Sequence, residues 1–488
     1  MRQVRDLTVS AVAEVSSPAK VATPGKLGLA ALTAIVIGSM IGAGVFSLPQ
    51  TMASGAAPLA MLIGWTITGI GVLSLALVYQ NLAVRKPKLD SGPYAYAKAG
   101  FGSFVGFNAA WGYWLSVCLG NVSFAIVMFS ALSYFFPVFG AGNTLPAIIG
   151  ASVILWSIHA VTLFGIREAS LVNLVTTFTK LVPIALFVVM VAVAFSGRTF
   201  TFDLRGLHNP SLGGLFPQLK STMLVTLWVF VGIEGASVIS ARAARRKDVG
   251  VATLLGFFTC LVIYISVSLL SLGIISQPAL AKLKNPSMAG VLGHIVGPCG
   301  EVLINVALVV SVLGAFLSWT MLAAEVPHVA ARDGTMPRFL ARENRRGAPA
   351  AALWVTNVAV QAILVVTLFA SSTYQSMFQI AATARLIPYV LSGAYAAKLA
   401  IRREAYRAGE TRTKDLIAGG VATIYGLWLV YAAGLLDVLL VALVYAAGIG
   451  VHVVARRERG EPIFTGIEGW IAGALLAMSV AAVWLLLK

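Results

Sequence analysis

Long apolar stretches follow one another along almost the whole chain, separated by short polar segments or by proline and glycine. Most are as long as the roughly 20 residues that an α-helix needs to cross about 30 Å of hydrocarbon. The pattern predicts an all-α polytopic membrane protein with short loops. We read about thirteen spans, with twelve as the alternative: residues 27–50, 56–84, 101–137, 144–165, 168–196, 215–240, 250–275, 298–331, 350–370, 374–400, 414–433, 435–455 and 466–487.

The composition agrees with a chain that lies mostly in lipid. Hydrophobic residues make up 59% of the chain and charged residues 11%, whereas soluble domains average about 25% charged residues. So little charge cannot cover a water-exposed surface, which excludes a soluble enzyme, a disordered protein and a nucleic-acid binder. Cys118, Cys260 and Cys299 are far apart in the sequence, so we expect neither a disulfide framework nor a metal site, and no cofactor.

The excess of positive charge reports the orientation of the chain in the membrane. There are 35 Lys and Arg against 18 Asp and Glu, a formal net charge of +17. Most of these cations fall in alternate loops, as the positive-inside rule requires of cytoplasmic loops. We therefore expect a multi-pass protein of the cell inner membrane with a cytoplasmic N-terminal tail, residues 1–26. The cation-rich loops are residues 85–98, 242–247, 332–346, 398–414 and 456–459.

Two predicted spans contain glycines that would interrupt a membrane helix. The span at 27–50 contains GSMIGAG, and the span at 215–240 contains WVFVGIEGAS. Each glycine weakens a helix by about 1 kcal/mol, and unpaired backbone groups are tolerated in lipid only where they line a cavity. Close packing of helices through small residues is the alternative interpretation.

The two interrupted spans are five spans apart, which gives them a functional interpretation. Because five is odd, a repeated unit of five spans recurs in the opposite orientation, and interrupted helices at matching positions of inverted halves indicate a secondary-transporter site. Free N–H groups at the start of a half-helix suit a carboxylate, and freed carbonyls suit an ammonium. The pattern therefore favours an α-amino acid as the ligand.

Five segments between residues 27 and 400 carry a resemblance to a known family. They are GSMIGAGVFSLP, SGPYAYAKAGFG in the loop before the third span, GYWLSVCLGN, LWVFVGIEGASVISARA and SWTMLAAEVPHVAARDGTMP. Together they resemble the amino acid–polyamine–organocation superfamily, its basic amino acid/polyamine antiporters and, most closely, arginine–ornithine antiporters. The resemblance implies the five-plus-five inverted-repeat fold of leucine-transporter type, with repeats at 27–196 and 215–400 and about three extra helices within 414–488.

The resemblance also implies a place for each part of an amino acid substrate. Its carboxylate is expected at the N–H groups of the first break and its α-ammonium at carbonyls of both breaks. Its side chain is expected between two tryptophans, strong cation–π partners, and toward the third span, where a tyrosine acts as a gate. The expected substrate-binding residues are Met40, Ile41, Gly42, Ala43, Gly44, Tyr113, Ser116, Val117, Asn121, Trp228, Val231 and Trp319.

Ionisable residues inside predicted spans are rare and usually functional. By resemblance, Glu234 is expected to be a protonation switch that couples gating to the substrate; a cap for freed N–H groups is the alternative. Lys180 is expected to take the place of a sodium ion by bridging carbonyls of the first span and the eighth span; a lysine that reaches the membrane surface is the alternative.

The resemblance gives no role to Arg385. Glu325 or a freed carbonyl could be its partner, and because a fixed cation would weaken the binding of a cationic substrate, we expect its side chain to point away from the site. Glu325 and His328 are expected to be solvated at the cytoplasmic end of the eighth span, and His159 to be packed within its helix.

The sequence therefore predicts a transporter that exchanges cationic amino acids, arginine for ornithine first, by alternating access around the two breaks. A proton-coupled lysine, histidine or polyamine transporter is the alternative of the same class. An ion channel is disfavoured because channels select through symmetric rings of groups. The expected partners are cationic amino acids and the lipid bilayer, and a homodimer is compatible with the sequence.

Overall fold

The computed structural model describes residues 27–89, 92–164, 166–238, 243–369 and 374–486. Within these ranges every regular element is a helix, apart from one isolated bridge between Leu27 and Ala243. Ten described helices are long and apolar enough to cross a membrane, or eleven when the bent pair α1 (Leu29–Met40) and α2 (Gly44–Ala53) counts as one span. The chain is therefore a multi-pass membrane protein.

The long helices follow the predicted spans to within a few residues at most boundaries. Two further helices, α7 (Ile166–Ala194) and α16 (Tyr374–Arg402), run over 29 residues each, more than the roughly 20 that a span requires. The other long helices are α3 (Pro58–Arg85), α5 (Ser103–Leu132), α6 (Leu145–Phe164), α9 (Leu215–Phe230), α11 (Arg246–Ser271), α14 (Pro298–Arg332), α15 (Ala350–Phe369), α17 (Thr413–Ala433), α18 (Leu435–Arg457) and α19 (Glu468–Leu486).

Short helices connect the spans where the sequence analysis predicted loops. The segment 91–102, expected as a loop, contains α4 (Pro93–Phe101), because a proline in the first turn suits a helix N-terminus. The helix stops at Gly102, whose φ of 99° is a conformation that glycine adopts without strain. Three more short helices lie in connections: α8 (Gly197–Thr201), α12 (Gln277–Ala281) and α13 (Ser287–Val296).

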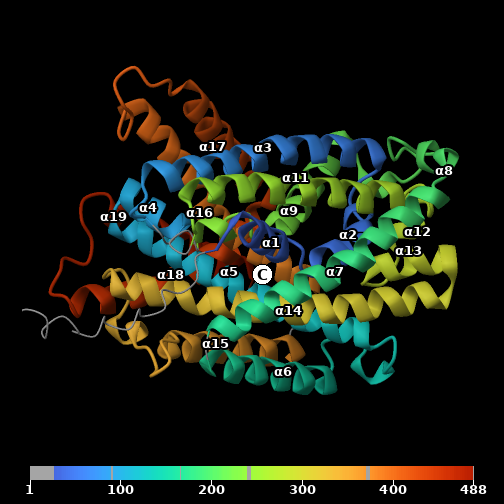
Figure 1. Cartoon of the computed structure of the whole chain (residues 1–488), viewed down its shortest axis with the longest axis horizontal. Coiled ribbons are helices and arrows are strands. Elements are labelled where there is room, and N and C mark those ends of the chain that lie inside the picture. Colours follow the sequence, from blue (N-terminus) through green and yellow to red (C-terminus); the bar gives the residue numbers. More distant parts are fainter. Residues whose placement is uncertain (1–26, 90–91, 165, 239–242, 370–373, 487–488) are drawn as a thin grey trace, which may run out of the picture.

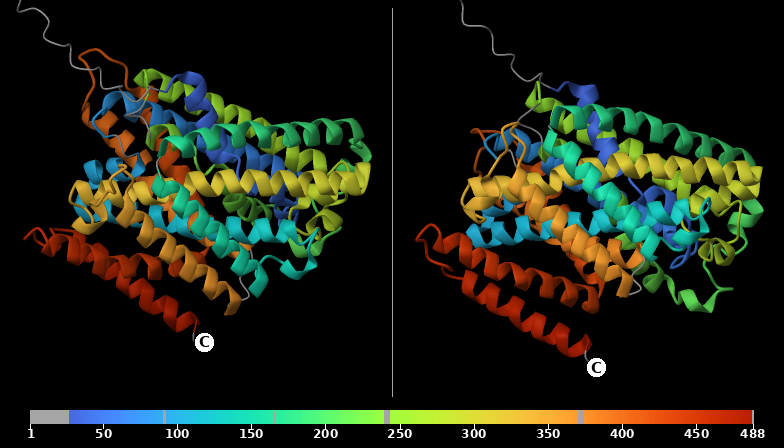
Figure 2. Two further views of the ribbon diagram at one scale, coloured as in Figure 1. Left: turned by 60° about the horizontal axis from the view of Figure 1, so that its bottom comes forward. Right: turned by 90° about the horizontal axis from the view of Figure 1, so that it is seen from below.

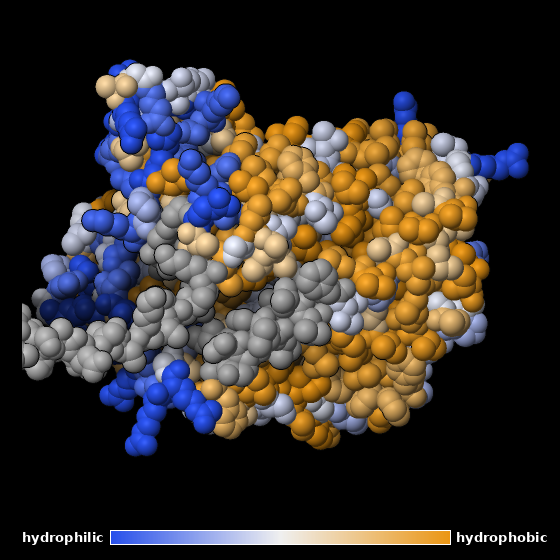
Figure 3. Space-filling model, in the orientation of Figure 1, coloured by the Kyte–Doolittle hydropathy of each residue, from blue (hydrophilic) through white to orange (hydrophobic). Residues whose placement is uncertain are grey.

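The two ends of the helix bundle differ in character. Figure 1 shows α4 at one end and α8, α12 and α13 at the other. In Figure 3, hydrophilic residues gather at the α4 end and around the start of α17, and hydrophobic residues cover most of the remaining face. Ion pairs join the cation-rich loops at this end, between Arg85 and Asp415 at 2.9 Å and between Lys98 and Asp333 at 3.1 Å. The cation-rich loops after α3, α14 and α16 therefore share one end.

The interrupted sixth span and α5 form the centre of the bundle. In the apolar 18-residue stretch of Leu215–Ser237, 83% of the residues are buried inside the molecule, and in that of α5 78% are buried. In α19 only 22% of the corresponding stretch is buried. Figure 2 shows α18 and α19 side by side at the edge of the molecule. The ligand site is thus to be sought where α5 meets the interrupted spans.

Candidate functional site

The first span is interrupted between α1 and α2. Ile41 leaves helical geometry with a ψ of 87°, and the two helix axes are bent by 44°. Because the N–H groups of a helix's first turn have no acceptor within the helix, the start of α2 offers free donors at Gly44. A Cβ on Gly44 would lie 3.0 Å from Val229 Cγ1 and 3.1 Å from Trp228 Cδ1, so glycine allows this backbone to approach the second break.

The second break lies between α9 and α10 (Gly235–Val238). Gly232 has a φ of 113°, a backbone conformation that residues with a side chain rarely adopt. A Cβ at this position would also lie 2.8 Å from the carbonyl carbon of Ser39. The Ser39 hydroxyl donates a hydrogen bond of 2.9 Å to the Gly232 carbonyl. This contact ties the two breaks to each other, so that the first turn of α2 and the last carbonyls of α9 lie near one another.

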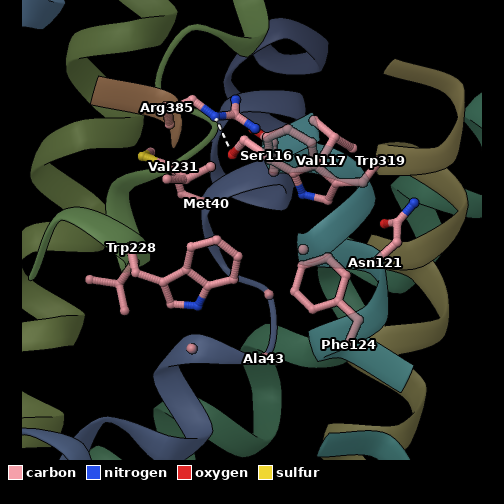
Figure 4. A pocket seen from close by; sticks show the side chains of 15 residues that line it. Met40, Ala43, Ser116, Val117, Asn121, Phe124, Trp228, Val231, Trp319 and Arg385 are labelled. Atoms are coloured by element: carbon pink, nitrogen blue, oxygen red, sulfur yellow. Dashed lines mark hydrogen bonds between the residues drawn. The ribbon is translucent and has the colours of Figure 1, made fainter. Parts of the chain in front are cut away.

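Both breaks line one cavity, which Figure 4 shows from close by. Of the expected substrate-binding residues, all but Ile41 and Tyr113 line it, and both exceptions are buried beside it. The cavity also has lining residues that the sequence analysis did not assign to the substrate. The full lining is Ser39, Met40, Gly42, Ala43, Gly44, Ser116, Val117, Gly120, Asn121, Phe124, Trp228, Val229, Val231, Trp319 and Arg385.

Aromatic rings fix the side walls of the cavity. Trp228 is stacked on Phe378 with 5.8 Å between ring centroids, and Phe124 lies 6.4 Å from Trp228. In Figure 4, Trp228 and Phe124 face each other across the cavity, with Trp319 near the end that holds Ser116. Since a side chain between these rings meets π faces, the walls suit an apolar stem or a cation.

Asn121 lines the cavity with a buried amide group. Its Nδ2 donates to Thr320 Oγ1 at 3.3 Å, and within the described residues its Oδ1 has no hydrogen-bond partner. A buried polar atom without a partner costs about 1–3 kcal/mol. A donor on a ligand in the cavity would recover that cost.

Lys180 from α7 lies against the first break. Its ammonium donates to the carbonyl of Gly38 at 2.6 Å and to that of Ile41 at 2.5 Å, and the residue is 1% exposed. Within the described residues, no hydrogen bond of this ammonium reaches α14. Lys180 therefore compensates carbonyls that the end of α1 leaves without helical donors.

The expectation that Arg385 points away from the site is wrong. The side chain comes from α16, lines the cavity and is 1% exposed. Its NH1 donates to Glu234 Oε1 at 2.7 Å, its Nε donates to Ser116 Oγ at 3.1 Å, and its guanidinium carbon lies 4.0 Å from the Tyr113 ring centroid and 5.1 Å from that of Trp319. A guanidinium stays charged, so its burial requires a carboxylate, and Glu234 rather than Glu325 provides it.

Glu234 is the acceptor at the centre of a buried cluster. Besides Arg385, the Tyr113 hydroxyl donates to Oε1 at 3.0 Å, the Tyr389 hydroxyl to Oε2 at 2.7 Å and the Gly232 N–H to Oε2 at 3.2 Å. The N–H contact is the capping interaction that the sequence analysis held as the alternative role. Tyr389 was missed there, although it stands four residues after Arg385, a spacing that puts both on one helix face.

His328 also differs from expectation. It is 3% exposed rather than solvated. Its Nε2 lies 3.1 Å from Glu343 Oε1 and its Nδ1 lies 3.4 Å from the Leu340 carbonyl. The segment that follows α14 folds back over this helix end, which span boundaries alone do not reveal. His159 is packed as expected, with Nδ1 2.9 Å from Asn357 Nδ2.

Comparisons with known proteins cover nearly the whole chain. A family model described as amino acid permease matches residues 27–472. The chain is 52% identical over 466 residues to an arginine/ornithine antiporter of Pseudomonas aeruginosa, covering 94% of this chain and 97% of that protein. It is 47% identical over 468 residues to a putative arginine/ornithine antiporter of Escherichia coli K12, covering 94% and 99%. It is 43% identical over 457 residues to an arginine/agmatine antiporter of Chlamydia trachomatis serovar L2, covering 93% and 95%.

A solved structure supports the fold independently. The substrate-bound, outward-open state of a Na⁺-coupled sialic acid symporter matches 85% of this chain and 90% of its own, with a TM-score of 0.54 at 12% identity. At that identity the likeness shows the fold alone. It confirms the predicted fold class, the all-helical fold of leucine-transporter type.

Proposed function

The chain belongs to the amino acid permease family, and from that membership we propose that it exchanges arginine for ornithine across the membrane by alternating access. The single observation that carries the proposal is the cavity in which both helix breaks meet between tryptophans. Relatives named as arginine/ornithine antiporters at 52% and 47% identity support the choice of substrates. Exchange of one cation for another also moves no net charge across the membrane. The membrane potential therefore neither drives nor opposes the exchange.

The breaks supply groups for the amino acid headgroup. The substrate carboxylate would accept hydrogen bonds from free N–H groups at Ala43 and Gly44, where the positive end of the α2 dipole favours an anion. The α-ammonium would donate to the carbonyls of Met40, Trp228 and Val231. The Met40 and Trp228 carbonyls each accept one backbone N–H, at 3.0 and 3.2 Å, and a carbonyl has a second lone pair for an ammonium.

The side chain would extend between the aromatic walls. Its stem would pack between Trp228 and Phe124, and its cationic end would reach toward Trp319. The free Oδ1 of Asn121 is an acceptor for a guanidinium or ammonium donor on the way. Arginine and ornithine both end in such donors, so one site can take both substrates in turn.

Two five-helix units would rock around this site. We propose residues 27–196 and 215–400 as the inverted repeats, 414–488 as additional C-terminal helices, and 1–26 as a cytoplasmic tail. The cation-rich end of the bundle would face the cytoplasm, in line with the positive-inside rule, in the cell inner membrane. Lys180 supports a sodium-independent cycle, because its ammonium supplies a fixed cation against the first break. Glu234 would couple gating to the substrate.

Efflux from proteoliposomes tests this function. Vesicles that contain the purified chain are loaded with labelled arginine and diluted into buffer with one unlabelled amino acid at a time. External ornithine and arginine should each drive efflux, whereas leucine and glutamate should not. Efflux at the same rate into buffer without any amino acid would contradict exchange, and efflux driven by lysine, histidine or a polyamine but not by ornithine would replace the proposed pair.

A further inference from the structure

The side chain of Arg385 fills the part of the cavity that the sequence analysis assigned to the cationic end of a substrate. Its guanidinium carbon lies 5.1 Å from the Trp319 ring centroid and 4.0 Å from that of Tyr113, and its Nε donates to Ser116 Oγ at 3.1 Å. Figure 4 shows this hydrogen bond at the end of the cavity where Ser116 and Trp319 meet. All three contacts are residues of the expected substrate-binding set.

A second cation cannot share these contacts without strong repulsion. The Arg385 guanidinium stays protonated, and it is 1% exposed, so water screens it little. A substrate guanidinium or ammonium that reached Trp319 would enter the same desolvated space. Either the substrate or Arg385 must therefore give up Trp319 and Ser116.

The contacts of Arg385 show that its side chain can leave Trp319 and Ser116 when a substrate binds. Arg385 has a second anchor, because its NH1 donates to Glu234 Oε1 at 2.7 Å. If its Nε releases Ser116, the ion pair with Glu234 remains, and the charge stays compensated. Glu234 also accepts hydrogen bonds from the Tyr389 hydroxyl at 2.7 Å and from the Gly232 N–H at 3.2 Å. These bonds keep the carboxylate in place, so the Arg385 guanidinium can move toward it and away from Ser116.

We propose that Arg385 is an internal surrogate for the cationic group of the substrate: it holds the Trp319 and Ser116 contacts and competes with arginine or ornithine for them. This inference rests on the proposed exchange of cationic amino acids. Such competition lowers the affinity for cations and speeds their release, which an exchanger needs on both sides of the membrane. It makes Arg385 a specificity-determining residue, because a neutral ligand of the same shape meets no repulsion.

Binding of a charged and a neutral ligand of one shape tests the surrogate role. Labelled arginine and labelled citrulline, in which a ureido group replaces the guanidinium, are titrated onto the purified parent and the R385Q/E234Q variant. The double substitution keeps the net charge and leaves no buried carboxylate without its partner. Arg385 lines the cavity and Glu234 does not, so the repulsion between the substrate cation and the nearer guanidinium outweighs the attraction of the more distant carboxylate. Arginine should therefore bind the variant at least about tenfold more tightly, while citrulline should change less than about threefold. R402Q, which removes an exposed cation from the same helix, should bind both ligands as the parent does.

Arginine binding that is unchanged or weaker in R385Q/E234Q, with citrulline binding retained, overturns the surrogate role. An equal change for both ligands also overturns it, because a merely structural ion pair does not distinguish a guanidinium from a ureido group. If the double variant does not fold, a structure of the arginine-bound parent decides: the substrate cation should lie at Trp319 with Arg385 withdrawn from Ser116. An Arg385 Nε that keeps its hydrogen bond to Ser116 while arginine is bound contradicts competition. A parent that neither binds nor exchanges arginine refutes the proposed function itself, which separates the two failures.

Discussion

The guanidinium carbon of Arg385 lies 5.1 Å from the ring centroid of Trp319, so the aromatic ring that suits a substrate cation already holds one. The ion pair with Glu234 keeps this cation neutralised within the bundle. In the proposed exchange, substrate recognition would depend on three groups of residues: the two helix breaks for the headgroup, the aromatic walls for the side chain, and the Glu234–Arg385 pair at one end of the cavity.

Replacement of Trp319 tests the aromatic contact. A cation–π contact is worth up to about 2 kcal/mol for a desolvated cation, so Trp319→Ala should raise the KM for arginine up to about 30-fold. Trp319→Phe keeps an aromatic face and should lose much less. The measurement is the arginine concentration dependence of exchange in proteoliposomes, with Trp470→Ala on the exposed face of α19 as the control. If Trp319→Ala has the same KM for arginine as the parent, Trp319 does not contact the substrate cation.

Asn121 gives a contrast between binding and stability. Because its Oδ1 bonds to nothing in the described structure, Asn121→Ala should cost the fold little, yet a lost bond to a charged donor should raise the Kd for arginine by about 10-fold or more. Asn108 is the matched control: it lies in the same helix and is buried, and its Oδ1 is also unpaired, but it does not line the cavity. Equal arginine affinities of Asn121→Ala and Asn108→Ala would refute the contact.

Lys180 should be needed for exchange but not for membrane insertion. Lys180→Ala removes the donor to the Gly38 and Ile41 carbonyls and loosens α7 from the first break, so expression should persist while arginine–ornithine exchange stops. The control is Lys282→Ala, at an exposed lysine that directly follows α12, at the end of the bundle away from α4. This variant should exchange arginine for ornithine at the parent's rate. The parent should show the same flux with sodium and with choline. Stimulation of the parent by sodium would show that Lys180 does not replace that ion.

Gly232 should tolerate no side chain. Its φ of 113° and the 2.8 Å approach to the Ser39 backbone mean that Gly232→Ala strains the second break by about 1–3 kcal/mol, so the melting temperature should fall and exchange should be lost. Gly420→Ala is the counterpart, because a Cβ there meets no atom within 4 Å and lies inside α17; it should be neutral or slightly stabilising. A Gly232→Ala variant with the parent's melting temperature would show that the break relaxes easily.

The sequence predicted most of the fold because lipid imposes a strong length and polarity rule on every span. It also located both breaks, since glycines and a carboxylate are costly within an apolar span unless they line a cavity. The direction of Arg385 could not be predicted: a long side chain in mid-membrane points toward whichever carboxylate the packing brings near, and Glu234 lies 151 residues away in sequence. The same holds for His328, whose partner Glu343 depends on how the chain turns after α14.

The proposed function requires a one-for-one exchange of cationic amino acids at a single cavity. Its most direct test is the rate of labelled arginine efflux against external ornithine, measured in proteoliposomes while a potassium gradient with valinomycin sets the membrane potential. One-for-one exchange predicts no efflux without an external substrate and, with ornithine outside, the same final distribution of labelled arginine at every potential. Efflux without a counter-substrate, or a final distribution that shifts with the potential, would contradict it.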